Sequence, residues 1–224
     1  ANTPAIHHQP IIEGVLYWNR YFGREVLQVR IADVAGAVPE DRTVIVRWIP
    51  WKEAGFAYGM IQSDPLSGEI LRGQIFFTSA FSDDYAGNMP APAKQDRTRL
   101  GLANIGSAAV SCDHHRAGST ATSDDLNPQV KAGAIADTVR SVMAHEVGHT
   151  LGLRHNFAAT FDAKISVEDI RSAYEKYKRD PMAPGLATAT SVMDYTSKRA
   201  DYLLGKYIST SEARLTYDGA AIRF

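Results

Sequence analysis

The sequence is poor in cysteine and lacks any long apolar run. Its 224 residues include a single cysteine, Cys112, which excludes a disulfide within the chain. No stretch approaches about 18 consecutive apolar residues, so no segment is a candidate membrane span. Neither sign of charge dominates, because 24 Lys and Arg stand against 25 Asp and Glu. This balance gives no basic surface for nucleic acid or for an anionic membrane, and we expect neither partner.

The remaining composition is that of an ordinary globular protein. Hydrophobic residues make up 45% of the chain and charged residues 22%, which excludes a disordered, collagen-like or coiled-coil protein. The length suits one large domain or two small ones. The chain begins at Ala1 without an initiator Met, and the apolar pattern at 217–224 stops without a helix cap. We therefore expect a piece of a longer protein that carries further domains.

Strand patterns precede helix patterns along the chain. The spacing of apolar residues predicts a helix over 10–22, ended by Gly23. Alternating or β-branched runs predict strands at 27–31, 43–49, 56–62 and 69–78, the last two joined as a hairpin. Residues 79–127 show no sustained period. Strands followed by helices in a chain of this size indicate a single α+β domain over residues 1–224.

The second half of the chain contains the strongest helix prediction. Asn127 is a good N-cap, Pro128 suits the first helical position, and helix formers continue to Leu151. A capping-box pattern at Ser166 starts another helix, which we expect to end near Asp180.

The long helix contains two histidines at metal-ligand spacing. His145 and His149 lie about 40° apart around an α-helix, so both imidazoles can reach one ion. Glu146 projects beside this pair, where it can hold a metal-bound water without being a ligand. Gly152 can take the positive φ that reverses the chain, which brings His155 to the same ion. Three His ligands with one open position are the pattern of a catalytic Zn²⁺ site.

The other histidines and the cysteine show no ligand pattern. His7 and His8 lie near a polar N-terminus, where we expect them to be exposed. Cys112, His114 and His115 have no paired Cys or His at ligand spacing elsewhere, which favours a solvated loop over a second metal site.

The run His145-Glu146-Val147-Gly148-His149, followed by Gly152 and His155, resembles the zinc signature of the metzincin metallopeptidases. That family carries a Met-containing turn after the zinc motif, and Ser191-Val192-Met193-Asp194-Tyr195 is similar to this Met-turn. Residues 64–70 and His155-Asn156-Phe157 look most like a group of large bacterial secreted metzincins. Asn156 departs from the Glu of astacins, the Asp of reprolysin-type enzymes and the Pro usual in serralysins.

The resemblance implies roles for further residues. Met193 would form a hydrophobic floor beneath the zinc site, and Tyr195 would place a hydroxyl near the metal. An outermost antiparallel strand would bind extended substrate, and its candidate residues are Gln74, Ile75, Phe76, Phe77 and Thr78. Residues 1–152 would form a subdomain with the sheet and the zinc helix. Residues 153–224 would form a smaller, mainly helical subdomain with the third His and the Met-turn. The family also implies a secreted, periplasmic or cell-surface location.

The function that we expect is hydrolysis of peptide bonds in a peptide or protein substrate. Glu146 would take the proton from a zinc-bound water and pass it to the leaving amine, and Tyr195 would donate a hydrogen bond to the oxyanion. Two alternatives stay open: a catalytically silent zinc-binding module of a larger surface protein, and a zinc hydrolase of a non-peptide amide or ester. An intact Glu146 argues against the first, and only the family resemblance argues against the second.

Overall fold

The chain folds as a mixed α+β protein, as the order of its sequence patterns predicts. The structure is a computed structural model that describes residues 3–32, 38–52, 55–81, 110–112 (backbone only), 126 and 128–223. The elements in chain order are η1 Ala5–His7, α1 His8–Leu16, α2 Asn19–Phe22, β1 Thr43–Ile49, β2 Ala57–Ser63, β3 Ile70–Thr78, η2 Ser79–Phe81, β4 Val110–Cys112, α3 Pro128–Thr150, α4 Ala159–Asp162, α5 Val167–Tyr177, α6 Lys198–Ile208 and α7 Thr216–Ala221.

Four strands form one mixed sheet in the order β1-β3-β2-β4. β1 runs parallel to β3, and β2 runs antiparallel to β3 on its other side. β4 pairs antiparallel with the far side of β2, where Tyr58 lies opposite Ser111. The predicted strands at 43–49, 56–62 and 69–78 are confirmed to within one residue at each end.

The predicted substrate-binding edge is wrong. Gln74, Ile75, Phe76, Phe77 and Thr78 belong to β3, which is hydrogen-bonded to β1 on one side and to β2 on the other. Its backbone groups are used within the sheet and cannot receive an extended peptide. The alternation of a strand shows which residues share a face, but it does not show where in the sheet the strand lies.

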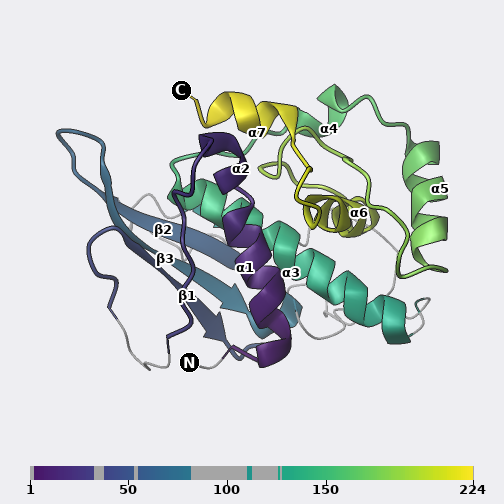
Figure 1. Cartoon of the computed structure of the whole chain (residues 1–224), viewed down its shortest axis with the longest axis horizontal. Helices are drawn as coiled ribbons and strands as arrows, with labels where there is room; N and C mark the ends of the chain where they lie inside the picture. Colours follow the sequence, from purple (N-terminus) through teal and green to yellow (C-terminus); the bar gives the residue numbers. More distant parts are fainter. Residues whose placement is uncertain are drawn as a thin grey trace, which may run out of the picture.

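Helix α3 packs across one face of this sheet (Figure 1). Ile75 and Phe77 of β3 are fully buried in the core between them. β2 comes close to α3 at Gly59, where an added Cβ would lie 3.0 Å from the carbonyl oxygen of Glu146. Because position 59 is a glycine, the sheet can contact the part of α3 that contains His145 and His149.

Helices enclose the other sides of α3. Figure 1 shows α1 alongside α3 and α6 on the side away from the sheet. α1 approaches at Gly14, where a Cβ would lie 2.7 Å from the carbonyl oxygen of Arg140. Every residue of α3 from 139 to 150 is buried as a result.

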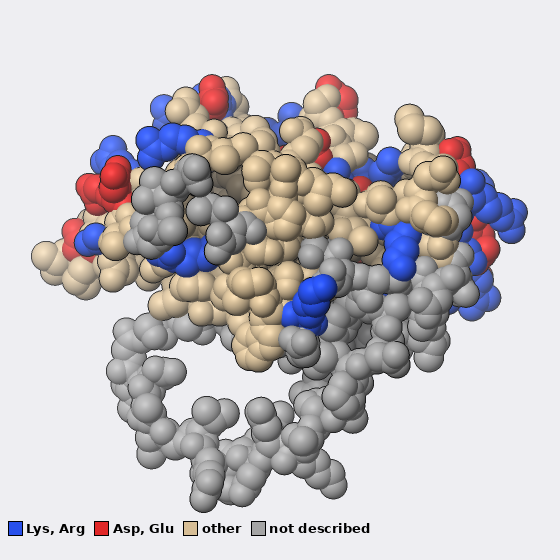
Figure 2. Space-filling model, turned by 90° about the horizontal axis from the view of Figure 1, so that it is seen from below, with Lys and Arg blue, Asp and Glu red and all other residues tan. Residues whose placement is uncertain are grey.

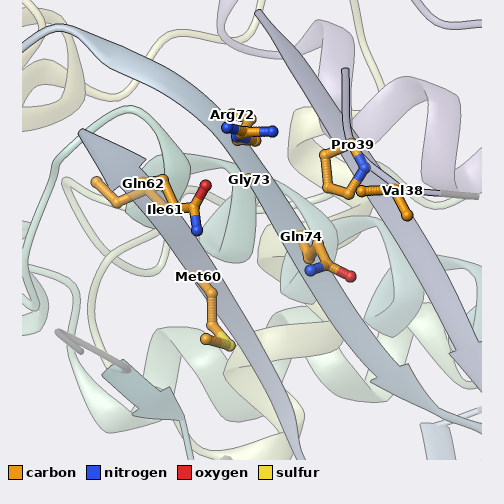
Figure 3. A pocket seen from close by; sticks show the side chains of 8 residues that line it. All are labelled: Val38, Pro39, Met60, Ile61, Gln62, Arg72, Gly73 and Gln74. Carbon is orange, nitrogen blue, oxygen red and sulfur yellow. The ribbon is translucent and has the colours of Figure 1, made fainter. Parts of the chain in front are cut away.

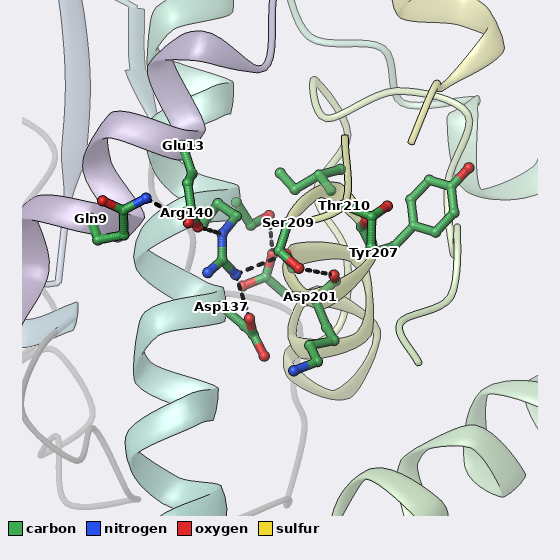
Figure 4. Close-up of polar contacts among 12 residues, drawn as sticks. Gln9, Glu13, Asp137, Arg140, Asp201, Tyr207, Ser209 and Thr210 are labelled. Atoms are coloured by element: carbon green, nitrogen blue, oxygen red, sulfur yellow. Dashed lines mark hydrogen bonds and ion pairs between the residues drawn. The ribbon is translucent and has the colours of Figure 1, made fainter. Parts of the chain in front are cut away.

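A buried arginine joins three of these helices (Figure 4). Arg140 of α3 forms ion pairs with Asp137, one turn earlier, and with Glu13 of α1 at 2.6 Å. It also donates to the carbonyl oxygen of Gly205 in α6 at 3.0 Å. The other oxygen of Asp137 accepts from Tyr177 of α5 at 2.7 Å. Removing one partner would leave an uncompensated buried charge, so this network fixes α1, α3, α5 and α6 relative to one another.

The prediction of an N-terminal helix at 10–22 is confirmed with a break. α1 and α2 cover this range, separated by a turn at Tyr17 and Trp18. Gly23 follows α2 with a φ of 65°, the left-handed conformation expected of a terminating glycine.

The predicted strand at 27–31 is wrong, because these residues join no sheet. The side-chain oxygen of Asn19 accepts from the N–H groups of Val26 at 3.0 Å and Leu27 at 2.8 Å. Its amide nitrogen donates to the carbonyl oxygen of Leu27 at 2.7 Å. At the start of this segment an amide side chain thus pairs backbone groups that a neighbouring strand could otherwise have paired.

The helix predictions in the second half hold with small shifts at the ends. α3 begins at Pro128 as predicted and ends at Thr150, whereas Asn127 lies outside the described residues. Ser166 forms the predicted capping box, and its helix α5 ends at Tyr177, before Asp180. The sequence patterns do not predict α6.

The predictions for residues 79–127 and for the histidines outside the zinc motif have mixed outcomes. Within 79–127 the structure has η2 and the short strand β4, although no element is expected there. His114, His115 and the side chain of Cys112 fall outside the described residues. His7 is buried, and its ring stacks on Trp48 with centroids 5.1 Å apart, so the prediction of exposure is wrong for this residue.

The described part of the surface carries mixed charge, and a shallow hollow lies on the sheet. Figure 2 shows acidic and basic side chains scattered around the rim of one face of the molecule. The hollow lies on the side of the sheet away from α3, where Met60, Gln62, Arg72 and Gln74 line it along β2 and β3 (Figure 3).

None of the helices in the described ranges has the length and hydropathy needed to cross a bilayer.

Candidate metal centre

Three imidazoles from α3 and the segment after it converge on one point. His145 and His149 stand one turn apart on α3, and their Nε2 atoms lie 3.1 Å from each other. The Nε2 atom of His155 also lies 3.1 Å from that of His149. His145 is 1% exposed and His149 5% exposed, whereas His155 is half-buried. Within the described part of the chain, no other three His, Cys, Asp or Glu side chains converge in this way.

The second ring nitrogen of each α3 histidine faces a backbone carbonyl. Nδ1 of His145 lies 2.6 Å from the oxygen of Val192, and Nδ1 of His149 lies 2.9 Å from that of Leu153. A carbonyl oxygen only accepts, so in both rings Nδ1 carries the hydrogen and Nε2 keeps a lone pair. Lone pairs directed at one point repel unless a cation lies between them. The histidines are therefore oriented as metal ligands are.

The spacing of these nitrogens fits zinc. Two nitrogens bound at about 2.0–2.1 Å to one tetrahedral Zn²⁺ lie about 3.3–3.4 Å apart, and the observed 3.1 Å is within about 0.3 Å of that separation. Three His ligands leave the fourth position of such an ion open for water or substrate. The donor set thus suits a catalytic site better than a closed structural one.

The end of α3 is built so that it orients His149. Gly152 has a φ of 90°, as predicted for a glycine that reverses the chain. Its N–H donates to the carbonyl oxygen of His149, and the N–H of Leu153 donates to that of Gly148, both at 3.0 Å. These two bonds make a Schellman motif. The motif places the carbonyl of Leu153 beside the ring of His149, so the helix cap also orients this imidazole.

A turn at 191–194 performs the same task for His145. Its Val192 carbonyl accepts from the imidazole, and the next N–H, that of Met193, donates to Ser191 Oγ at 2.9 Å. Ser191 Oγ donates in turn to Asp218 of α7 at 2.6 Å. Asp218 is fully buried, and burial raises the pKa of its carboxyl to about 6 although three hydrogen bonds lower it.

Met193 packs against the histidine motif from this turn. It is fully buried, and a Cβ added to Gly148 would come within 2.3 Å of its sulfur. Trp18 closes on the same glycine, with a ring carbon 2.9 Å from the added atom. The Trp18 ring is held by a bond from Nε1 to the carbonyl oxygen of Ala144 at 2.8 Å. Gly148 therefore fits a slot between two fixed side chains.

Glu146 follows His145 in α3 and is enclosed by protein. It is 0% exposed, in the segment of α3 against which Gly59 packs. Helix geometry turns its side chain about 60° from that of His149. A carboxylate shielded from water interacts strongly with positive charge close to it.

Tyr195 approaches the histidines from the side of His155. Its hydroxyl lies 3.1 Å from Nε2 of His155, and the two ring centroids are 4.6 Å apart. Asp194 accepts from the backbone N–H of Tyr195 at 2.7 Å and from the N–H and hydroxyl of Thr160 at 2.7 and 2.6 Å. These bonds tie the turn to α4 and fix the direction in which the tyrosine leaves it.

The structure brings His145, His149, His155 and Tyr195 together and packs Met193 against Gly148, whereas the strand at 74–78 lies inside the sheet. No sequence pattern assigns a supporting role to Asp218, to Ser191 of the predicted Met-turn, or to Gly59, which lets β2 approach α3. The only sequence signal for Asp218 is a charged residue inside the apolar pattern at its end of the chain. That signal does not identify a partner 27 residues earlier.

Two family models match the sequence. The model described as Met-zincin matches residues 127–224, and that described as Metallo-peptidase family M12B Reprolysin-like matches residues 72–156. Both stretches contain His145, Glu146, His149 and His155. The two matches support a metzincin zinc metallopeptidase. Comparisons with curated proteins and with solved structures gave no match.

Proposed function

We propose that this chain is a zinc-dependent endopeptidase. The observation that carries the proposal is the convergence of three Nε2 atoms, two of them held as acceptors by backbone carbonyls. The matches to two metallopeptidase families support peptide bonds as the target. When bound there, zinc supplies positive charge that polarises a carbonyl and acidifies a water.

The chain's own residues supply the proton transfers. Glu146 is the general base: it accepts a proton from the attacking water and delivers one to the leaving amine. Its burial supports this role, because a carboxylate shielded from water interacts more strongly with the positive charge of a bound Zn²⁺.

Tyr195 donates a hydrogen bond to the substrate carbonyl oxygen, on which negative charge develops during the reaction. The 3.1 Å distance from its hydroxyl to the Nε2 atom of His155 supports this role, because it brings the phenol to the ligand cluster. Met193 is the packing residue of a Met-turn, a role supported by its contact with Gly148. We infer a secreted, periplasmic or cell-surface enzyme from the family resemblance alone.

The test is a cleavage assay on a denatured protein mixture with zinc present, in which product ends are mapped. Wild type is compared with Glu146→Gln, which keeps the shape of the side chain and removes the base. We expect the variant to bind zinc and fold as wild type does, with a rate lower by about 10²–10⁴-fold.

The outcomes separate the proposal from its alternatives. Zinc binding without cleavage of any protein or peptide would favour a silent binding module. Cleavage of esters or non-peptide amides alone would favour a different hydrolase. Undiminished peptide cleavage by Glu146→Gln would remove the general base from the proposal.

A further inference from the structure

Three hydrogen bonds in series connect the ligand His145 to a carboxylate on the last helix. Nδ1–H of His145 donates to the carbonyl oxygen of Val192 at 2.6 Å. The N–H of the same peptide group, which belongs to Met193, donates to Ser191 Oγ at 2.9 Å. Ser191 Oγ–H donates to Asp218 Oδ1 at 2.6 Å. Each donor along this relay points the same way, from the imidazole toward the carboxylate.

The relay lies away from water along its whole length. Exposure is 1% for His145 and 0% for Ser191, Met193 and Asp218. Hydrogen bonds in series polarise one another, and more so in such a low-dielectric place. A negative charge at the far end draws the Nδ1 hydrogen toward Val192 and makes Nε2 a stronger electron donor.

Two other bonds hold Asp218 in position. Its Oδ2 atom accepts from the N–H of Val192 at 3.1 Å and from the hydroxyl of Tyr17 at 2.7 Å. Tyr17 is fully buried in the turn between α1 and α2, and its hydroxyl also lies 2.6 Å from that of Tyr21. The carboxylate therefore has a fixed place between α7, the 191–194 turn and the N-terminal helices.

We propose that Asp218 is a positioning residue for the zinc ligand His145. Through Ser191 and the peptide group between Val192 and Met193, it fixes the ring and strengthens donation from Nε2. The proposal rests on the three-histidine site of the proposed function, and its probe is zinc itself.

The test measures the zinc dissociation constant by competition with a chelator, and the visible spectrum of the Co²⁺-loaded protein. Asp218→Ala should weaken zinc binding by about 10–100-fold, the usual effect of losing an outer partner of a ligand. Asp218→Asn keeps an acceptor for Ser191 but not the charge, so its loss should be smaller. The Co²⁺ bands should shift in the same order.

Asp137→Ala is the matched control, because Asp137 is also buried and hydrogen-bonded but belongs to the Arg140 network. It should lower the melting temperature and leave the zinc constant and the Co²⁺ bands unchanged. If Asp218→Ala does not fold, Ser191→Ala is the variant to measure. It removes the hydroxyl that connects Asp218 to the peptide group between Val192 and Met193, so zinc binding should weaken by about 3–10-fold.

The outcomes distinguish this inference from the proposed function. Wild type that binds no zinc would overturn both. Wild type that binds zinc, with unchanged constants in Asp218→Ala or in Ser191→Ala, would overturn the role of Asp218 alone.

A second inference, from a different observation, concerns Phe157 on the solvent-exposed side of the histidine cluster. Phe157 is 66% exposed, yet its ring lies against two site residues, with centroids 5.5 Å from His155 and 5.7 Å from Tyr195. The exposed ring therefore lies beside the His155 and Tyr195 side of the histidine cluster. We propose that Phe157 forms one wall of a substrate subsite that takes a large apolar or aromatic side chain next to the scissile bond. This second proposal also rests on the proposed function.

Phe161 supplies a matched control for Phe157. It is 86% exposed and one helical turn further on, in α4. On a peptide library, Phe157→Ala should lower kcat/KM by about 3–10-fold for peptides with a large apolar residue beside the cleaved bond, and less for the others. Phe161→Ala should leave this preference intact. Cleavage with the same preference in Phe157→Ala would refute the subsite, whereas absence of Glu146-dependent cleavage in wild type would refute the proposed function and the subsite with it.

Discussion

The close packing of Met193 against Gly148 predicts that Gly148→Ala lowers the free energy of unfolding, and the distances in the structure indicate by how much. Gly148→Ala would place a methyl group 2.3 Å from the sulfur of Met193 and 2.9 Å from the ring of Trp18. Met193 is fully buried and Trp18 is tied to the carbonyl of Ala144, so neither moves away freely. Forcing a methyl group into such a core costs about 1–3 kcal/mol.

Gly133 provides the matched control within the same helix. A Cβ at this position would meet no described residue within 4 Å. Gly133→Ala should therefore stabilise the protein by about 0.5–1 kcal/mol, the gain in helix propensity. Gly148→Ala receives the same gain, so the difference between the two variants in free energy of unfolding isolates the overpacking cost of about 1–3 kcal/mol.

Denaturant titration of the two variants measures this difference directly. Thermal unfolding should separate their melting temperatures by about 2–12 °C, at roughly 2–4 °C per kcal/mol for a chain of this length. In a Met193→Ala background the difference should shrink, because the sulfur no longer occupies the space. Equal stability of Gly148→Ala and Gly133→Ala would refute the tight packing of Met193 on the histidine motif.

The remaining predictions concern Tyr195 and Asp218. Tyr195→Phe should lower kcat by about 10–10³-fold with little change in KM and none in zinc content, whereas a lower melting temperature with intact kcat would show a packing role alone. Burial raises the pKa of Asp218 to about 6, so the folded chain binds this proton more tightly than the unfolded chain, whose pKa is about 3.9. The stability of wild type relative to Asp218→Asn should be greatest below about pH 4 and fall by about 2–3 kcal/mol as the pH rises to about 7. Tyr17, which donates to this carboxyl, has a raised pKa and stays neutral over the range, and a difference that does not vary with pH would contradict the prediction.

The convergence of the three histidines is predictable from sequence because local geometry determines it. The spacing of His145 and His149 fixes their common face on any α-helix. Gly152 then adopts the positive φ that a helix-ending glycine favours, and His155 follows within three residues. None of these steps depends on contacts from distant parts of the chain.

The features that sequence reasoning misses depend on such distant contacts. The place of β3 inside the sheet is set by pairing with β1 and β2, which the alternation at 74–78 cannot show. The segment 27–31 has a strand pattern, yet the side chain of Asn19 bonds the backbone of Val26 and Leu27, where the segment begins. Asp218 supports His145 only because α7 returns to the 191–194 turn.

The most direct test of the central claim is the zinc content of the purified chain, measured by elemental analysis after reconstitution and removal of excess metal. Three imidazoles that converge on one point predict about one zinc per chain. His149→Ala should lose the metal, because the two remaining histidines cannot hold it tightly. A wild-type chain that takes up no zinc, or a His149→Ala chain that keeps it, would contradict the assignment of these histidines as a zinc site.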